Sequence, residues 1–549
     1  MYENKIFDTL KINQNNYHAN VYKEKYISTR KEYVKAIDNL SKKNTSLEWW
    51  VSSPAFKFIQ NDNIYHAITL IEAIKKFRRD KKVPEIIYVK NNLIKNIIEQ
   101  NKNYLKINRI KIISQTKYFY KLKIFITSTK TLFNFLIIKF LSKFLLKKNI
   151  NKKLYLIDSY FILNRSDNDR YYGKYLKKLI IQNDNFQVIP TFISKNIFDF
   201  REIRNFFKIA RDDNYIIKEN FISFYQLLKI FYLLHTCYKK LNKKVFTFNN
   251  IDYSEILKCE IKNNKNFELS FIGFMNYTFF KNIKYKKFSI IKSINWFENQ
   301  PSSKGWFYGL SKYFPRSTSI GYQGFTYFPE MLSIFPTNQE FLSRVVPKQI
   351  TLIGKAYKNL INEFTNNIDF KIGEATRFEY LLNLNPKNFN DRKIDYALIL
   401  SGIQYIDLEI INLANKFIKN NSKIYIKAHP IFNPAPYLKN KSNFILTDEN
   451  FSYLLENSKC LIISGSTSAL MEAIALGINL VIPKVTYFED IFISKIKLYN
   501  NQKALNSDEF KIFIKSRVFL KKPFDFKKII NSEFFNLSQS GNIDKVFRI

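Results

Sequence analysis

Two short segments in the second half of the chain carry residues suited to binding a phosphate group. His429, one of only four histidines in the chain, follows the apolar run "KIYIKA". A second apolar run, "KCLII", is followed by a small-residue loop and then by a strong helix-forming sequence. The loop consists of Ser464, Gly465, Ser466, Thr467 and Ser468. Hydroxyl groups, free backbone N–H groups and the positive end of a helix dipole together favour an anion such as phosphate.

The loop has more hydroxyl groups than a helix needs at its start. One Ser or Thr hydroxyl is enough to cap a helix, and many helices have such a cap. Four hydroxyl groups and a glycine within five residues therefore favour phosphate binding over capping alone.

His429 and this loop each follow a predicted strand, and in open α/β sheets ligands bind beyond the carboxyl ends of the strands. A lone histidine at a strand end is more often structural than ligand-binding. Here an imidazole and a hydroxyl-rich loop end strands of one predicted sheet, and both could donate hydrogen bonds to a nucleotide diphosphate. Pro430 stops the strand so that His429 faces the ligand, and Lys427 either adds positive charge or is solvated.

The first half of the chain offers a carboxylate, Glu298, at the end of the predicted strand in "SIIKSINWFENQ". Partial burial raises a carboxyl pKa toward working pH and makes a general base, and aromatic neighbours stack on sugar faces. Glu298 is therefore a candidate base, with a buried glutamate bonded to its own loop as the alternative. The residues expected to line the acceptor side of a cleft are Trp296, Asn299, Gln300, Tyr322 and Gln323.

The elements that must position these residues alternate between strands and helices. "EIIYVK", "RIKIIS", "KLYLIDSYFI" and "FQVIPTFIS" read as strands in the first part, and "SLEWWVSSPAF" reads as a buried strand with its exit loop. After Pro347 a second alternating unit follows, with "YALILSGI", "KIYIKAHP", "NFILTD", "KCLIISGS" and "NLVIPKV" as strands. Such alternation predicts an α/β fold with mostly parallel sheets in two Rossmann-like domains, 1–346 and 347–549.

Residues 117–148 interrupt this alternation with aromatic and aliphatic residues punctuated by lysine. Lys130, Lys139 and Lys143 break any apolar run long enough to span a bilayer. Their spacing suits a cationic amphipathic helix or helical hairpin lying in a membrane interface. The alternative is a core helix whose lysines reach toward solvent.

Composition narrows the class of protein. Lysine and arginine outnumber aspartate and glutamate by 88 to 46 in the 549 residues, but Asn, Ile, Phe and Tyr are enriched together with Lys, as an AT-rich genome would cause. No recognisable nucleic-acid module carries the charge, so no nucleic-acid partner is expected. Cys237, Cys259 and Cys460 lack paired spacing and read as reduced packing residues of a cytoplasmic protein. The polar amino terminus lacks the apolar core of a secretion signal.

The segments "IKAHP" and "SGSTSALMEAIALGINLVIP" resemble the nucleotide-binding half of GT-B glycosyltransferases, including bacterial sialyl-, polysialyl- and Kdo-transferases and teichoic-acid glycerophosphotransferases. More narrowly, "SLEWWVSSPAF", "DNDRYYGKYL", "INWFENQPSSKGWFYGL" and "IGYQGF" resemble bacterial surface-carbohydrate biosynthesis proteins. The resemblance spans about residues 45–490. It implies two Rossmann-like domains facing a central cleft and metal-independent transfer, with no cofactor and a nucleotide-sugar as substrate.

The resemblance also implies roles for single residues. His429 would be a ligand of the donor phosphate, and Ser466, Thr467 and Ser468 would form the phosphate loop. Glu472 would lie near the donor ribose or, alternatively, on a helix surface. Arg377, in "GEATRFEYL", matches the arginine of a Gly-Pro-x-x-Arg pattern, although this chain has Gly-Glu in place of Gly-Pro.

The function that these features favour is transfer of a sugar from a nucleotide-activated donor to a surface polysaccharide or lipid-linked glycan. The enzyme would be cytoplasmic, with a possible peripheral contact to an anionic membrane through residues 117–148. The alternatives are a CDP-polyol phosphotransferase of the teichoic-acid type, a non-catalytic glycan-assembly protein that retains the fold, and a UDP-sugar epimerase. The long aromatic first domain and residues 117–148 argue against the epimerase.

Overall fold

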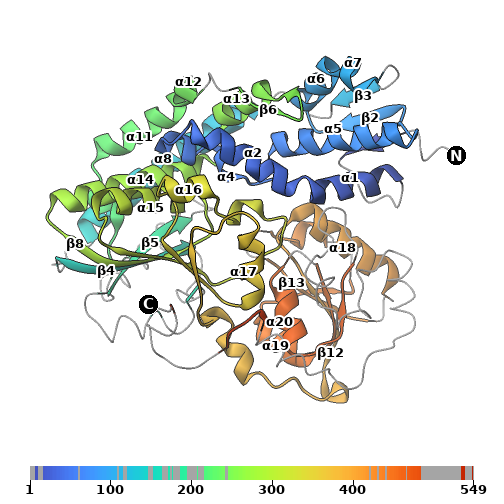
Figure 1. Cartoon of the computed structure of the whole chain (residues 1–549). Coiled ribbons are helices and arrows are strands. Elements are labelled where there is room, and N and C mark those ends of the chain that lie inside the picture. Colours follow the sequence, from blue (N-terminus) through green and yellow to red (C-terminus); the bar gives the residue numbers. More distant parts are fainter. Residues whose placement is uncertain are drawn as a thin grey trace.

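The chain forms an α/β structure with three parallel sheets, shown as a computed structural model in Figure 1. The described residues are 6–9, 17–59, 62–107, 111–114, 120–145, 152–162, 171–172, 176, 186–193, 207, 215–241, 245–418, 422–429, 432–438, 442–464, 467–483, 533–537 and 547. Every pairing between the named strands in this part is parallel except that of β6 (Thr247–Phe248) with β7 (Ile251–Asp252). The predicted fold class, two Rossmann-like domains with mostly parallel sheets, is confirmed.

A small sheet near the amino terminus has the order β1-β2-β3. Its strands are β1 (Ile6–Asp8), β2 (Ile86–Val89) and β3 (Lys111–Ser114). The predictions for "EIIYVK" and "RIKIIS" are confirmed, but these strands form a sheet of their own and do not continue into the next one.

The segment "SLEWWVSSPAF" was predicted as a strand, and this prediction is wrong. It folds into two short helices, α3 (Leu47–Trp50) and α4 (Ser53–Phe56). The Ser46 hydroxyl accepts a hydrogen bond from the Trp49 backbone N–H, and a proline stands at the start of α4. Ser-capped and Pro-started turns favour helix, and here they outweigh the strand preference of the aromatic run.

The central sheet of the first domain has the order β11-β10-β9-β8-β4-β5. Its strands are β4 (Lys153–Ile162), β5 (Phe186–Ile193), β8 (Ser289–Trp296), β9 (Thr318–Gln323), β10 (Gln349–Leu352) and β11 (Asp369–Ile372). The two predicted strands beginning at "KLYLID" and "FQVIP" are confirmed. Because β10 pairs with β9 and β11 pairs with β10, the sheet continues past Pro347, and the change to the next sheet lies between Ile372 and Ile394.

The second domain contains a sheet of order β14-β13-β12-β15-β16. All five strands lie where the apolar runs predicted them. They are β12 (Ile394–Ile399), β13 (Ile424–Lys427), β14 (Phe444–Leu446), β15 (Ser458–Ile463) and β16 (Leu480–Val481). Helices α18 (Gln404–Phe417), α19 (Phe451–Asn457) and α20 (Ala469–Ala475) connect them.

Helices cover the first domain, as the upper part of Figure 1 shows. They are α1 (Tyr17–Ser28), α2 (Arg30–Lys42), α5 (Asn63–Arg79), α6 (Asn92–Gln100), α7 (Lys102–Leu105), α8 (Tyr120–Leu145), α11 (Phe224–Thr236), α12 (Tyr238–Leu241), α13 (Ser254–Asn263), α14 (Phe267–Tyr285), α15 (Pro301–Tyr313), α16 (Asn338–Leu342) and α17 (Lys355–Asn362). Helices α14 and α15 pack so closely that a side chain at Gly305 would collide with the backbone of Gly273. The four tryptophans are fully buried in this domain.

Candidate functional site

In the sheet of the second domain, the loops that follow β12, β13 and β15 lie at one edge. β12 lies between β13 and β15, and Ile399 of β12 pairs with both Lys427 and Ile463. His429 therefore lies two residues beyond one neighbour of β12, and Ser464 lies one residue beyond the other. Strand spacing of about 4.8 Å places the two backbones about 10 Å apart across β12, a span that one diphosphate group and its sugar can bridge.

The loop after β12 is held in a fixed shape between these two. The buried carboxylate of Asp407 accepts hydrogen bonds from the backbone N–H groups of Ser401 (2.7 Å) and Gly402 (2.8 Å) and from the Ser401 hydroxyl (2.8 Å). Gly402 has a φ of 87°, a conformation that glycine adopts without strain. Asp407 could not be predicted from the sequence, because nothing in a lone helical aspartate points to a neighbouring loop.

The structure describes three residues of the serine-rich loop, and Gly465 and Ser466 lie outside the described part. Ser464 is buried, and the Thr467 hydroxyl accepts a hydrogen bond from the Ala469 backbone N–H at 3.4 Å. Ser468 stands at the N-cap of α20 but makes no side-chain cap bond. Thr467 therefore helps start the helix, while the phosphate role of the loop stays a prediction.

Lys427 bonds the loop after β14. Its exposed ammonium group donates a hydrogen bond to the backbone carbonyl of Asp448 at 3.1 Å. The two alternatives for Lys427, charge for the ligand or solvation, stay predictions.

Glu472 is buried on α20, so the alternative of a surface position is wrong. Its carboxylate accepts a hydrogen bond from the hydroxyl of Tyr380, which lies in the 3₁₀ helix η4 (Thr376–Asn383). Arg377 lies in the same 3₁₀ helix, one turn earlier. The segment after β11, the last strand of the central sheet of the first domain, is thus hydrogen-bonded to α20, the helix that follows the serine-rich loop.

Glu298 lies just beyond the carboxyl end of β8 and is held on both oxygens. Trp296 Nε1 donates to Oε1 at 2.8 Å, and the Gln300 amide donates to Oε2 at 2.5 Å. The Gln300 carbonyl in turn accepts a bond from the Tyr160 hydroxyl at 3.3 Å. These bonds fix the direction of the carboxylate, which a general base needs, but they also fit a glutamate that supports its own loop.

Electrostatics at Glu298 involve a fourth predicted residue, Arg377. Burial raises the pKa of Glu298 above its usual value, and the hydrogen bonds from Trp296 and Gln300 and the positive charge of Arg377 act against this rise. Arg377 therefore lies close enough to favour the carboxylate form. Glu298 thus has Trp296 and Gln300 as hydrogen-bond partners, and the charge of Arg377 acts on it from a second segment of the chain.

Asn299 and Tyr322, predicted to line the acceptor side, instead support the framework. Asn299 donates to the buried carboxylate of Glu340 at 3.1 Å. Glu340 also forms ion pairs with Lys57 (2.5 Å) and Lys304 (2.8 Å), and all three charged side chains are buried. The Tyr322 hydroxyl donates to the backbone carbonyl of Glu374 at 2.7 Å.

Gln323, the last of the predicted cleft residues, is fully buried at the end of β9. Both atoms of its amide group lack a hydrogen-bond partner within the described part of the chain. A buried amide without partners is costly, and the described residues offer no physical account of this one.

Tyrosines complete the surroundings of Glu298, and the sequence did not single them out. Tyr171 packs edge-on against Trp296, with ring centroids 4.8 Å apart, and also contacts Tyr160. Tyr160 donates or accepts a hydrogen bond with Ser302 at 3.1 Å. With 35 tyrosines in the chain, their type alone carries no signal, and only the quoted segment "DNDRYYGKYL" pointed to this region.

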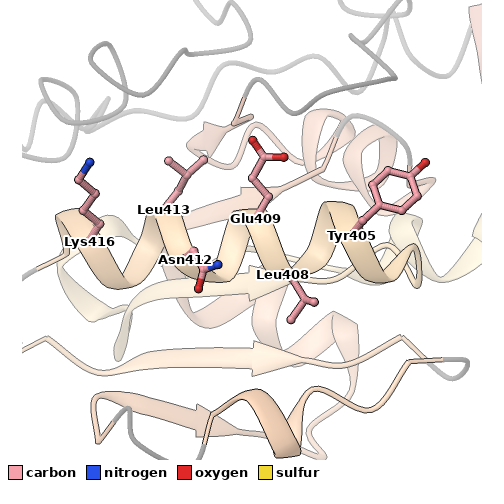
Figure 2. Close-up of a pocket in the computed structure, with 6 residues that line it drawn as sticks. All are labelled: Tyr405, Leu408, Glu409, Asn412, Leu413 and Lys416. Atoms are coloured by element: carbon pink, nitrogen blue, oxygen red, sulfur yellow. The ribbon is translucent and has the colours of Figure 1, made fainter. Parts of the chain in front are cut away.

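A hollow of about 440 Å³ lies elsewhere, along one face of α18. Figure 2 shows the six described side chains that line it, all from this one helix: Tyr405, Leu408, Glu409, Asn412, Leu413 and Lys416. None of them is among the predicted site residues. The candidate site is therefore defined by the loops at the sheet edges and not by this hollow.

Comparisons with known proteins found similar folds only. No protein-family model matches the chain, and no curated protein matches it. Among solved structures, UDP-GlcNAc 2-epimerase from Neisseria meningitidis bound to UDP-GlcNAc matches at 12% identity and a TM-score of 0.38, covering 69% of this chain and 94% of that one. MurG from Acinetobacter baumannii matches at 10% identity and 0.34, covering 69% and 94%. The wall teichoic acid polymerase TagF matches at 10% identity and 0.35, covering 78% and 96%. At these values none of the three says what this chain binds or does.

Proposed function

We propose that the chain is a glycosyltransferase that moves a sugar from a nucleotide-activated donor to a surface polysaccharide or lipid-linked glycan. One observation carries this proposal. The charge of Arg377, in the segment from Gly373 to Asn383, acts on the Glu298 carboxylate, and the Tyr380 hydroxyl of the same segment bonds Glu472 on the helix after the serine-rich loop. A carboxylate from one sheet and a phosphate-type loop from another are thereby linked through a single short segment.

In this proposal the second domain binds the donor. His429 and the serine-rich loop donate hydrogen bonds to the leaving diphosphate, and these bonds strengthen as negative charge develops on it. Arg377 adds positive charge on the side that faces the first domain. This chemistry uses the chain's own donors and needs no cofactor.

The first domain binds the acceptor. Glu298, directed by Trp296 and Gln300, accepts the proton of the acceptor hydroxyl while that oxygen attacks the anomeric carbon of the donor sugar. The half-buried ring of Tyr171, which packs edge-on against the buried Trp296, supplies apolar surface near the carboxylate. Such surface stacks on sugar rings and excludes water.

The donor class is tested by incubating the purified full chain with radiolabelled UDP-, CMP- and CDP-linked compounds and a lipid extract as acceptor. Transfer of a labelled sugar to the lipid or glycan fraction supports the proposal. Transfer of a polyol phosphate from a CDP-linked compound would assign the chain to the phosphotransferases instead. Donor binding without transfer to any acceptor would favour an assembly protein, and interconversion of a UDP-sugar without acceptor would make it an epimerase.

A further inference from the structure

Helix α8 exposes large apolar side chains, which a helix of a soluble protein normally buries. It runs from Tyr120 to Leu145, about 39 Å at 1.5 Å per residue. Within the described chain it is the one helix long and apolar enough to cross a membrane, over Ile124–Lys143, yet only 28% of that window is buried. A core helix of this composition would be largely covered.

The exposed face of α8 carries large apolar side chains. Phe125, Ile126, Phe133 and Phe140 are exposed by 59, 57, 56 and 54%. Single exposed apolar residues are common on soluble proteins and need no explanation. Four on one helix, each more than half exposed, form a patch that marks an interaction surface.

The buried face of α8 combines polar side chains with the apolar Phe135 and Ile138. Ser128, Thr131 and Ser142 are buried, as is Lys139. The Lys139 ammonium donates to the backbone carbonyl of Glu219 at 3.0 Å, and the Ser142 hydroxyl donates to the Asn220 side chain at 2.6 Å. These bonds fasten the carboxyl-terminal part of α8 to the segment around Glu219, and the ring of Phe135 stacks on Phe271 of α14. The helix therefore lies on the protein.

Helix α11 packs beside α8 and shows the same feature. Phe224, Tyr225, Leu228 and Tyr232 are exposed, Tyr225 by 72% and Tyr232 by 69%. The two helices meet where the Lys139 ammonium lies 5.2 Å from the ring of Phe224. The eight exposed side chains of α8 and α11 are called the two-helix surface below.

The charged side chains of the two helices themselves have one sign, although Glu268 of α14 acts on Lys130 from the neighbouring helix. Lys130, Lys143 and Lys229 are exposed on these helices. Neither helix contains an aspartate or a glutamate. Lysines at a membrane surface attract anionic lipid headgroups, and each contributes about 1 kcal/mol.

We propose that the two-helix surface binds peripherally to the headgroup region of an anionic bilayer. Phenylalanine, isoleucine and leucine enter the apolar boundary, tyrosine stays at the interface, and the lysines contact the headgroups. A second copy of the chain fits this surface poorly, because it would bring lysines of the same charge together without acidic partners from either helix. Residues 117–148 were predicted to form such a contact, and α11 is the new half of it. The inference needs no transferase activity, so it holds or fails independently of the proposed function.

The first test is flotation of the full chain with vesicles of phosphatidylcholine containing phosphatidylglycerol. Two variants remove one half of the surface each: Phe133→Ser with Phe140→Ser on α8, and Tyr225→Ser with Tyr232→Ser on α11. Each should lower the bound fraction at limiting lipid by about tenfold, since each removes two interfacial aromatic side chains. The matched control, Tyr104→Ser with Leu342→Ser, removes two apolar side chains exposed elsewhere and should bind like the unchanged protein.

The second test reports contact directly. All four native tryptophans are buried, so a tryptophan introduced by Phe133→Trp or Tyr232→Trp can be distinguished by its quenching with brominated lipids. Quenching at both positions, with release of the protein by alkaline carbonate, supports a peripheral two-helix contact. Quenching at Phe133→Trp alone, or retention after carbonate, overturns it. So does flotation that is equal for anionic and neutral vesicles, or a change of oligomeric state in the α8 and α11 variants without vesicle binding.

Discussion

The hydroxyl of Tyr380 donates a hydrogen bond to the Oε2 atom of Glu472, across 92 positions of the sequence. Tyr380 lies in the segment that follows the central sheet of the first domain. Glu472 lies on α20, the helix that follows the serine-rich loop of the second domain. The bond links the two halves of the candidate site. Its strength can be measured apart from any activity.

We expect Tyr380→Phe and Glu472→Gln to be coupled in a double-mutant cycle. A hydrogen bond to a buried charged group is worth about 1.5–3 kcal/mol, and removing either partner leaves the other unpaired. The sum of the two single losses in unfolding free energy, measured with urea, should exceed the loss in the double variant by about 1 kcal/mol or more. Additive losses would show that the bond does not contribute to stability.

A second prediction concerns the buried charges behind the "FENQ" loop. Burial raises the pKa of Glu340, but Lys304 and Lys57 more than offset this and bring it down to about 2. Glu340→Gln would leave two buried lysines without a counter-charge, which costs about 3–5 kcal/mol of unfolding free energy. The matched control is Glu255→Gln, which breaks an exposed ion pair with Lys258 and should leave the urea midpoint unchanged. Equal midpoints for both variants would contradict the prediction.

Long apolar strands were the part of the fold that the sequence predicted best. The five strands of the second domain follow from uninterrupted runs such as "KCLII", because parallel strands are buried on both faces. The strand prediction for the "SLEWW" segment was wrong because a serine cap favours a helix there, and an aromatic run does not reveal this. The domain boundary at Pro347 is predicted from a proline, which marks a break in the chain. The membership of β10 in the central sheet depends instead on its pairing with β9, which no local sequence pattern encodes.

The candidate site was predictable only where chemistry and strand ends coincide. His429, the serine-rich loop and Glu298 all end apolar runs, so their positions follow from topology. Tyr160, Tyr171 and Tyr380 could not be chosen from many tyrosines. Asn299 looked like an acceptor residue, but it bonds Glu340, and Glu340 pairs with Lys57 from 283 positions away. Polar contacts between residues so far apart in the sequence cannot be predicted from the spacing of residues along the chain.

His429→Ala should lower transfer without unfolding the protein. Removing one donor to the leaving phosphate costs roughly 2–4 kcal/mol of transition-state stabilisation, or about thirtyfold to a thousandfold in turnover. Lys427→Ala is the matched control on the same strand, because its ammonium group already bonds the Asp448 carbonyl. Activity of the His429→Ala variant within about threefold of the unchanged protein would remove His429 from the mechanism.

Glu298→Gln should preserve the shape of the loop and donor binding while it lowers turnover by about a hundredfold or more, the usual scale for a lost general base. Donor affinity measured by calorimetry checks that the second domain is unaffected. If turnover stays within a few-fold of the unchanged protein, the carboxylate only supports its loop. Asp158 is the next carboxylate to test, since it is buried in β4 and burial raises its pKa to about 6.

The pH dependence of transfer tests the effect of the Arg377 charge on Glu298. A general base works as a carboxylate, so turnover should rise with pH as Glu298 loses its proton, and burial places this rise above the usual range for glutamate. The charge of Arg377 favours the carboxylate. Arg377→Gln should therefore move the acid limb of the profile to higher pH, by about half a unit or more, and lower turnover more at pH 6 than at pH 8.

The exposed Arg316 offers a matched control, because Arg316→Gln removes the same charge outside the contacts described for Glu298. Its acid limb should coincide with that of the unchanged protein. In the Glu298→Gln variant the limb should disappear, since the titrating group is gone. A limb that survives in Glu298→Gln, or that does not move in Arg377→Gln, would assign the titration to another group and leave Arg377 as a donor-side charge.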